Sequence, residues 1–241
     1  MFAVISADVV SSTSLPNNKL IKLTQKLNEC LNELEGKLEG KDRPYYGTKY
    51  EGWGRVVRGD TIELFLEHPE DAFEVAILLK AWTKAIVESK DWKDTDGEEM
   101  SAPTAISKNF SKYGLRIAIG IGGMKTFDRT LNIMDGEAIY RSGRALNNLS
   151  GYDKYAITIS MENEEVAQTL QVIMALVNQI INKATPRKCE TLYYRLLFKD
   201  SYLTADKMNI TVSGVNQTLN DLGWSAIEGA IQYYRKVTSK L

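Results

Sequence analysis

The chain has 241 residues, of which 44% are hydrophobic and 25% are charged, with a formal net charge of −1. This composition is typical of a globular protein, and no apolar run is long enough to suggest a transmembrane helix. The N-terminus lacks the basic region and cleavage site of a signal peptide. The cysteines Cys30 and Cys189 form no CxxC pair. We therefore expect a cytoplasmic protein with two free thiols and no membrane association.

Alternating apolar patterns predict the elements of the first half of the chain. Residues 2–10 form an apolar run that predicts a buried strand, and residues 50–66 predict two strands around Arg58-Gly59-Asp60. Residues 69–86 predict a helix, whereas the polar residues 89–112 predict a surface loop. After Pro16, leucines at three- and four-residue spacing predict an amphipathic helix. These leucines are Leu20, Leu23, Leu27, Leu31, Leu34 and Leu38.

The second half continues the alternation of strands and helices. Residues 115–121 predict a third strand that ends in a glycine-rich turn, and residues 133–149 predict a connection followed by a helix. Residues 155–160 predict a strand, and residues 162–183 a long helix. Strands that alternate with helices, joined by one hairpin, predict an α/β (α+β) sheet domain with helices packed on it.

A boundary at Ala184-Thr185-Pro186 predicts two domains, residues 1–183 and residues 184–241. From Lys183 to Leu241, nine Lys or Arg stand against five Asp or Glu, so the tail is mildly basic. This charge suggests a nucleic-acid partner. Short helices are predicted over residues 188–198, 204–208, 211–219 and 225–237.

The segment LTADKMNITVSGVNQTLNDLGW has the spacing of a helix-turn-helix. Ala205 is the small residue between the helices, Asn209 suits a left-handed turn, and Val215 and Leu219 bury the second helix. The alternative is a plain helical bundle that packs or dimerises, because the exposed face carries no Lys or Arg. If this helix enters a major groove, its exposed polar residues would contact base edges or phosphates. They are Thr211, Ser213, Gly214, Asn216 and Gln217.

Three segments of the first domain form an ordered set. Asp8 ends the first strand, Gly59-Asp60 lies in the hairpin, and the strand LRIAIGIGG precedes the helical sequence MDGEAIYRSGRAL, which contains Arg141 and Arg144. This set resembles the class III nucleotidyl cyclases, and the third segment looks closer still to the bacterial SatD family. The resemblance covers roughly residues 1–160. It implies a ferredoxin-type sheet with helices.

The resemblance also implies roles for individual residues. Asp8 and Asp60 would bind Mg²⁺ or Mn²⁺ ions that neutralise a nucleoside triphosphate. Arg144 would stabilise charge on the α-phosphate, reaching across the interface of a homodimer. The backbone N–H groups of the turn after Asp8 would hold phosphates. The residues of this turn are Val9, Ser11, Ser12 and Thr13.

The chain departs from the cyclase pattern where the base and the ribose are recognised. Tyr140 stands where cyclases have a ribose-positioning Asn, and Val56 where they have a purine-reading Lys. Ile133 replaces the base-reading Asp, while Asp135 is shifted by two positions. The metal-binding half of the pattern is therefore present and the base-recognition half is altered. This favours ligand binding over purine cyclisation.

Each of these residues also has an ordinary structural interpretation. Asp8 can cap a strand end, Asp60 can be a hairpin turn residue, and Arg144 can form a structural salt bridge. Three functions stay open. The first is a domain that binds a nucleotide or another phosphorylated ligand and controls a DNA-binding tail, as in a transcriptional regulator. The second is an active nucleotidyl cyclase or related phosphoryl-transfer enzyme, and the third is a non-catalytic scaffold. We favour the first.

Overall fold

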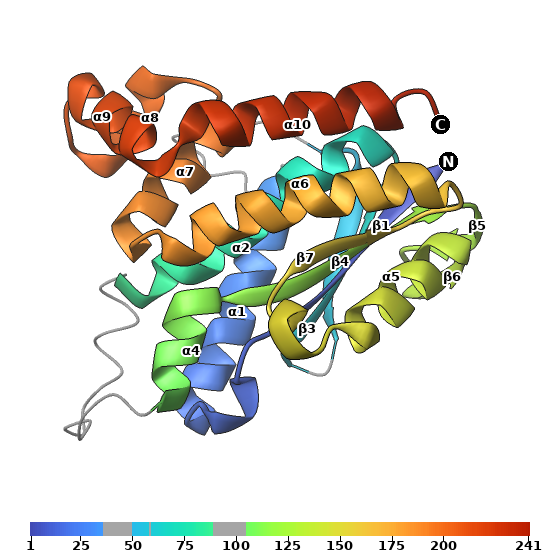
Figure 1. Cartoon of the computed structure of the whole chain (residues 1–241). Coiled ribbons are helices and arrows are strands. Elements are labelled where there is room, and N and C mark those ends of the chain that lie inside the picture. The colour runs from blue at the N-terminus through green and yellow to red at the C-terminus, as the bar shows by residue number, and fades with distance from the viewer. Residues whose placement is uncertain (36–49, 58, 89–104) are drawn as a thin grey trace.

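The computed structural model describes residues 1–35, 50–57, 59–88 and 105–241. Within these ranges the fold is mixed α/β, as predicted, with a five-stranded sheet and a two-stranded sheet (Figure 1). The strands are β1 (Phe2–Val9), β2 (Gly52–Val57), β3 (Thr61–Leu66), β4 (Leu115–Gly122), β5 (Met124–Asp128), β6 (Ile133–Gly136) and β7 (Ile157–Ser160). The α-helices are α1 (Asn17–Leu34), α2 (Ala72–Ala85), α4 (Ala105–Tyr113), α5 (Glu137–Asn148), α6 (Glu164–Lys183), α7 (Pro186–Phe198), α8 (Ser201–Met208), α9 (Val212–Leu222) and α10 (Trp224–Thr238).

The large sheet has the strand order β2-β3-β1-β4-β7. Strand β1 pairs antiparallel with both β3 and β4, whereas β7 pairs parallel with β4. Helix α1 connects β1 to β2 with β3 between them, and α2 connects β3 to β4 with β1 between them. Two β-α-β units are therefore interleaved in one sheet.

The two faces of the sheet are covered differently because side chains alternate along each strand. In β1, Ala3, Ile5 and Ala7 belong to the large core that also contains buried residues of α1, α2 and α6. Val4 belongs to a second cluster with Ala138 of α5. Helix α5 and the β5-β6 hairpin therefore lie on the face opposite to α1 and α2.

Helix α5 lies unusually close to β4, and this explains one of the glycines after the third predicted strand. A Cβ atom on Gly120 would lie 2.1 Å from the Ala138 carbonyl oxygen and 2.4 Å from the Ser142 nitrogen. Any larger residue at this position would push α5 off the sheet. Gly120 is therefore a packing residue.

The helices after residue 183 share the main core with the sheet domain. Helix α7 lies against α2, and α10 contacts α6 and α2. Leu196 of α7 and Tyr234 of α10 are fully or almost fully buried in the same cluster as β1. These contacts do not decide whether residues 1–183 and residues 184–241 fold separately. The division at residue 183 therefore stays a prediction.

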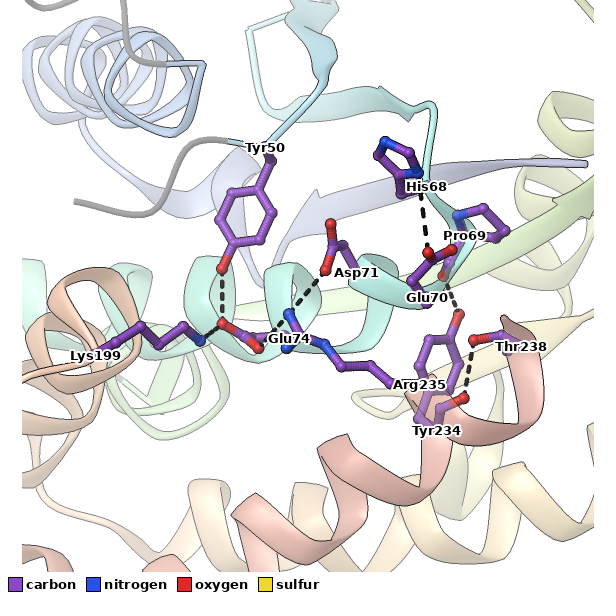
Figure 2. Close-up of polar contacts among 10 residues, drawn as sticks. All are labelled: Tyr50, His68, Pro69, Glu70, Asp71, Glu74, Lys199, Tyr234, Arg235 and Thr238. Atoms are coloured by element: carbon purple, nitrogen blue, oxygen red, sulfur yellow. Dashed lines mark hydrogen bonds and ion pairs between the residues drawn. The ribbon is translucent and has the colours of Figure 1, made fainter. Parts of the chain in front are cut away.

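A buried carboxylate on α2 links these C-terminal helices to the body (Figure 2). Glu74 is 1% exposed and forms ion pairs with Lys199, at the end of α7, and with Arg235 of α10. The Tyr50 hydroxyl donates to the same carboxylate at 2.8 Å. Arg235 also bonds to Asp71 at 2.8 Å. One acidic side chain thus connects three segments that are far apart in the sequence.

Two lysines of α2 are buried among backbone carbonyls. The Lys80 ammonium donates to the Leu115 and Tyr155 carbonyls, at 2.5 and 3.1 Å. Burial, together with the charge of Lys84, lowers the pKa of Lys80 to about 7. The Lys84 ammonium caps the end of α6, where a cation is favoured by the helix dipole. It donates to the carbonyls of Ile181, Asn182 and Ala184.

Some predicted elements need correction. The surface loop predicted over residues 89–112 is wrong from residue 105 onward, because α4 forms there and buries Phe110 in the core. The β5-β6 hairpin was not predicted, since its two short strands expose much of their surface and lack a clear apolar alternation. Residues 89–104, Leu38 and Arg58 lie outside the described residues. Among the described helices, none has the length and apolar character needed to cross a membrane.

Candidate functional site

Cross-strand register places three rows of side chains on the α5 face of the sheet. The first row is aromatic or small, with Trp53, Phe65, Val4 and Gly120 in register. Phe127 of β5 stacks on Phe65 with the ring centroids 4.2 Å apart, so this row is covered. The second row contains Arg55, Glu63, Ser6 and Ala118, and the third contains Val57, Thr61, Asp8 and Arg116. This face thus becomes polar toward the end of β1 that carries Asp8.

Asp8 and Asp60 meet at this polar end. The β2-β3 turn is fixed beside β1, because the Val9 amide donates to the Asp60 carbonyl at 3.1 Å. On the other side, the Thr24 hydroxyl of α1 donates to the Gly59 carbonyl at 2.6 Å. Gly59 has a φ of 83°, a left-handed conformation that glycine adopts readily. The turn therefore presents Asp60 toward the end of β1.

The two carboxylates influence each other directly. Burial raises the pKa of the Asp8 carboxyl, and both the charge of Asp60 and a hydrogen bond with it raise that pKa further. The Ser12 hydroxyl donates to Asp60 Oδ2 at 2.5 Å. Two acidic groups in contact repel each other when both are ionised. A divalent cation between them would relieve this repulsion.

Arg116 is the residue of this site that was not predicted. Its Nε and Nη2 atoms donate to Asp8 Oδ2 at 3.0 and 2.7 Å, and this interaction opposes the rise in the pKa of Asp8. Its position after Leu115 gave no sign of this role. Only the antiparallel register of β1 and β4 places it opposite Asp8. Strand register likewise places Arg55 opposite Glu63 in the neighbouring row, where the two side chains are bonded.

The predicted phosphate cradle is partly occupied by the protein itself. The Val9 N–H group donates to the Asp60 carbonyl. The Ser12 hydroxyl, which is separate from its backbone N–H group, donates to the Asp60 carboxylate. Ser11 has left-handed backbone angles, φ 61° and ψ 30°, and Ser12 starts a short 3-10 turn, residues 12–14, in which Thr13 is exposed. For the other two cradle residues, Ser11 and Thr13, the structure describes no hydrogen bond to Asp60.

Mg²⁺ and Mn²⁺ prefer carboxylate oxygens as ligands, and Asp8 and Asp60 could supply two of them. Within the described ranges, no group of three or more His, Cys, Asp or Glu side chains is arranged to hold a metal ion. A cation here would therefore depend on these two carboxylates and on oxygens from its ligand or from water. It would also compete with Arg116 for Asp8.

The predicted catalytic residues Arg144 and Tyr140 lie in a separate groove with Asp135, which was predicted to bind the ligand. Tyr140, Asp135 and Arg144 line a groove of about 1260 Å³ between α5, β7 and α6, and neither Asp8 nor Asp60 is part of its lining. The Tyr140 hydroxyl donates to Asp135, which raises the pKa of the phenol. The structure therefore brings the predicted residues together in two groups, one at the end of β1 and one along α5.

The predicted DNA-binding residues lie on α9 and at its start. Asn209 has φ 52° and ψ 49° and ends α8 in the left-handed conformation that the sequence predicts. Thr211 caps α9 by accepting a hydrogen bond from the Gly214 amide at 3.0 Å. Ser213, Asn216 and Gln217 are exposed. Asn216 also lies 3.2 Å from the Ser201 hydroxyl.

The packing beneath α9 is also as the sequence predicts. Ala205 of α8 forms a small apolar cluster with Val215 and Leu219 of α9, and all three side chains are buried. The exposed polar residues are consequently fixed on the outer side of α9.

Comparison with protein-family models, with curated proteins and with solved structures finds no match for this chain.

Proposed function

We propose that the chain binds a nucleotide or another phosphorylated small molecule together with Mg²⁺ or Mn²⁺, and that its C-terminal helices bind DNA. The observation that carries this proposal is the convergence of Asp8 and Asp60 at one end of the sheet, where Asp8 is in register with Thr61 and the Val9 amide donates to the Asp60 carbonyl. A divalent cation at this pair would present a positive charge to the ligand's phosphates. Arg116 is close enough to contribute a second positive charge.

The strand order supports a cyclase-like fold for the body. Strands β1 to β4 are arranged as β2-β3-β1-β4 with antiparallel pairing throughout, and α1 and α2 form the two crossovers. A ferredoxin-type sheet has the same strand order and pairing, and this likeness supports the proposal. We propose that β7 extends it by one parallel strand, and that the hairpin between β2 and β3 supplies the second metal ligand.

The geometry of α8 and α9 supports a helix-turn-helix. A short left-handed turn at Asn209 separates the helices, and the buried Ala205 allows their close approach. In this proposal α9 is the recognition helix, and Gln217 and Asn216 are the residues best suited to read base edges, because amide side chains can pair with adenine. The basic charge of the tail would contribute binding to the phosphate backbone.

Binding is favoured over catalysis by the state of Asp8. Arg116 neutralises one of the two carboxylates that a two-metal mechanism would require, and Tyr140 replaces the ribose-positioning amide. We propose that arrival of the metal and the phosphorylated ligand moves Arg116 from Asp8 to a phosphate. The ion pairs of Glu74 with Lys199 and Arg235 connect α2 to α7 and α10.

A phosphoryl-transfer enzyme is the second candidate, because the same pair of carboxylates could hold catalytic metal ions. In that case Arg144 would act on a ligand held by another subunit. Release of pyrophosphate from a nucleoside triphosphate in the presence of Mn²⁺ would distinguish this candidate, provided that Asp60→Asn abolishes the release.

The first test is a thermal-shift screen of the full chain with Mn²⁺ and a panel of nucleoside mono-, di- and triphosphates and sugar phosphates. Ligand binding to the native state raises the melting temperature. We expect at least one phosphorylated compound to raise it only when Mn²⁺ is present. The absence of any metal-dependent shift across the panel would contradict the proposal.

A further inference from the structure

Strand β7 is an open edge of the sheet. It is last in the strand order, and no other strand of the described ranges pairs with its outer side. On its inner side, the Ala156 carbonyl accepts from the Ile117 amide, so the alternate residues Ile157 and Ile159 direct their backbone groups outward. Edge strands are usually protected by charges or proline, but the sequence of β7, ITIS, contains neither.

The groove described above runs along this edge. Every residue of β7 lines it, with α5 on one side and α6 on the other (Figure 1). A further strand in a sheet lies about 4.8 Å from its neighbour. Because Ile157 and Ile159 are only 2% and 1% exposed, such a strand has to displace the side chains that cover their outward backbone groups. One outward group is already engaged, since the Gln171 side chain of α6 donates to the Ile159 carbonyl at 3.0 Å. The exchange of this side chain for a backbone amide would keep the carbonyl bonded.

The exposed face of α6 beside the groove carries no charge. Between Glu165 and Lys183 the sequence contains no Asp, Glu, Lys or Arg, although the helix lies at the surface. Val172 and Leu176 are 63% and 65% exposed. Depletion of charge around exposed apolar side chains is typical of the buried centre of a protein interface. The exposed residues of this face are Gln168, Thr169, Gln171, Val172, Ala175, Leu176 and Gln179.

We propose that a second copy of this chain covers this face, with the two β7 strands paired antiparallel across a two-fold axis. Such an interface must be complementary to itself. Helix α6 satisfies this condition, because Glu164 and Glu165 begin it and Lys183 ends it, so that antiparallel helices bring opposite charges together. Gln168 lies four residues before Val172, and Gln179 lies three residues after Leu176, so the two glutamines flank the apolar centre almost symmetrically in the sequence.

Helix α5 is complementary to itself in the same way. Its acidic residue Glu137 lies in the first turn, and Arg144 lies near the other end. Glu137 is bonded to Arg141 of its own helix, and in the antiparallel dimer Arg144 of one copy approaches this pair on the other. This arrangement differs from the cross-subunit arginine that the cyclase resemblance implies, since Arg144 is directed to the partner's α5 and not to Asp8 and Asp60. The dimer consequently does not depend on a nucleotide.

Sedimentation equilibrium of the full chain over a wide concentration range tests this proposal. We expect a dimer whose dissociation constant rises roughly tenfold to a hundredfold in Leu176→Glu, because a charge is placed in the apolar centre. Val172→Glu should act in the same way. The matched control is Ile21→Glu on α1, where Ile21 is 61% exposed and lies outside the interface. This variant should dimerise as the unmodified chain does.

Hydrogen exchange provides a second measurement that is specific for the strand pairing. The amides of Ile157 and Ile159 should exchange more slowly in the dimer than in the dissociated chain, while circular dichroism confirms that each variant is folded. A chain that stays monomeric at every concentration would overturn the proposal. So would a dimer that survives both glutamate substitutions, because its interface would then lie elsewhere.

Discussion

Arg116 and Asp8 form a close ion pair in which the Nε and Nη2 atoms of the guanidinium both donate to the same oxygen, Oδ2, at 3.0 and 2.7 Å. Asp60 approaches the same aspartate and raises its pKa. The end of β1 therefore holds two neighbouring carboxylates, one of which, Asp8, is bonded to a guanidinium. A metal ion bound at this pair would therefore compete with Arg116 for Asp8.

Replacing Arg116 by Met should strengthen the binding of Mn²⁺ alone. The substitution removes the competing cation from Asp8 and leaves two carboxylates whose repulsion a divalent ion would relieve. We expect a roughly tenfold lower dissociation constant, about 1.4 kcal/mol, by isothermal titration calorimetry. The matched control is Arg55→Met, which removes the neighbouring Arg55–Glu63 pair. Unchanged or weaker Mn²⁺ binding by the Arg116 variant would show that the two cations do not compete.

Replacing Glu74 by Gln should destabilise the whole chain. The buried carboxylate balances Lys199 and Arg235, and its loss leaves these two cations facing a neutral amide. Because both partners are partly exposed, we expect a loss of roughly 2–3 kcal/mol in the free energy of unfolding, below the range for fully buried pairs. Urea denaturation measures this value. Glu70→Gln, one turn earlier, should change it little, and equal stability of the two variants would refute the central role of Glu74.

The stability of the chain should rise with pH from about pH 7. The pKa of Lys80 is lowered to about 7 in the folded chain, whereas an unfolded lysine titrates near pH 10.4. Between these values the unfolded chain binds the extra proton, so a rise in pH favours the folded state. Above about pH 8.5, the buried Cys189, whose pKa is raised to about 11, acts in the opposite direction.

The Lys80→Met variant isolates this contribution. From pH 7 to about 8.5 the free energy of unfolding of the unmodified chain should rise by on the order of 1–2 kcal/mol. The rise should be much smaller in the variant, while Lys240→Met at the exposed C-terminus should retain it. Chemical denaturation at several pH values provides the measurement. An identical pH dependence in Lys80→Met and the unmodified chain would show that Lys80 does not titrate in this range.

DNA binding should depend on the amide side chains of α9. We expect the full chain to select a duplex from a randomised DNA pool, with an affinity that falls as the salt concentration rises. Gln217→Ala should weaken binding to the selected duplex by about 1–3 kcal/mol, measured by fluorescence anisotropy. Gln232 is an exposed glutamine of α10, and Gln232→Ala is the matched control. Equal affinities of the two variants would argue that α9 does not contact bases.

The sequence predicted the mixed α/β fold and most of the long elements because their apolar patterns are regular. The leucine spacing of α1 and the apolar stripe of α6 each place one face on the core. The turn at Asn209 was predictable because asparagine tolerates left-handed backbone angles. The short hairpin of β5 and β6 was missed, because its position is set by contacts of Phe127 with Trp53 and Phe65.

The candidate site was predictable in its acidic residues and not in its basic one. Asp8 and Asp60 interrupt apolar runs, so each attracts notice in the sequence. Arg116 lies within the predicted strand and becomes part of the site only through the pairing of β1 with β4. The separation of Arg144 and Tyr140 from the two aspartates is likewise a consequence of the position of α5 over the sheet. Such relationships depend on strand register, which a single sequence does not specify.

The central claim is that Asp8 and Asp60 form a metal-dependent site for a phosphorylated ligand. Calorimetric titration of the best compound from the nucleotide and sugar-phosphate panel into the full chain with Mn²⁺ tests it most directly. We predict binding that is lost in Asp60→Asn and retained in Glu67→Gln, which changes an exposed carboxylate just after the far end of β3. Equal binding by the Asp60 variant and the unmodified chain, or binding that persists without Mn²⁺, would contradict the claim.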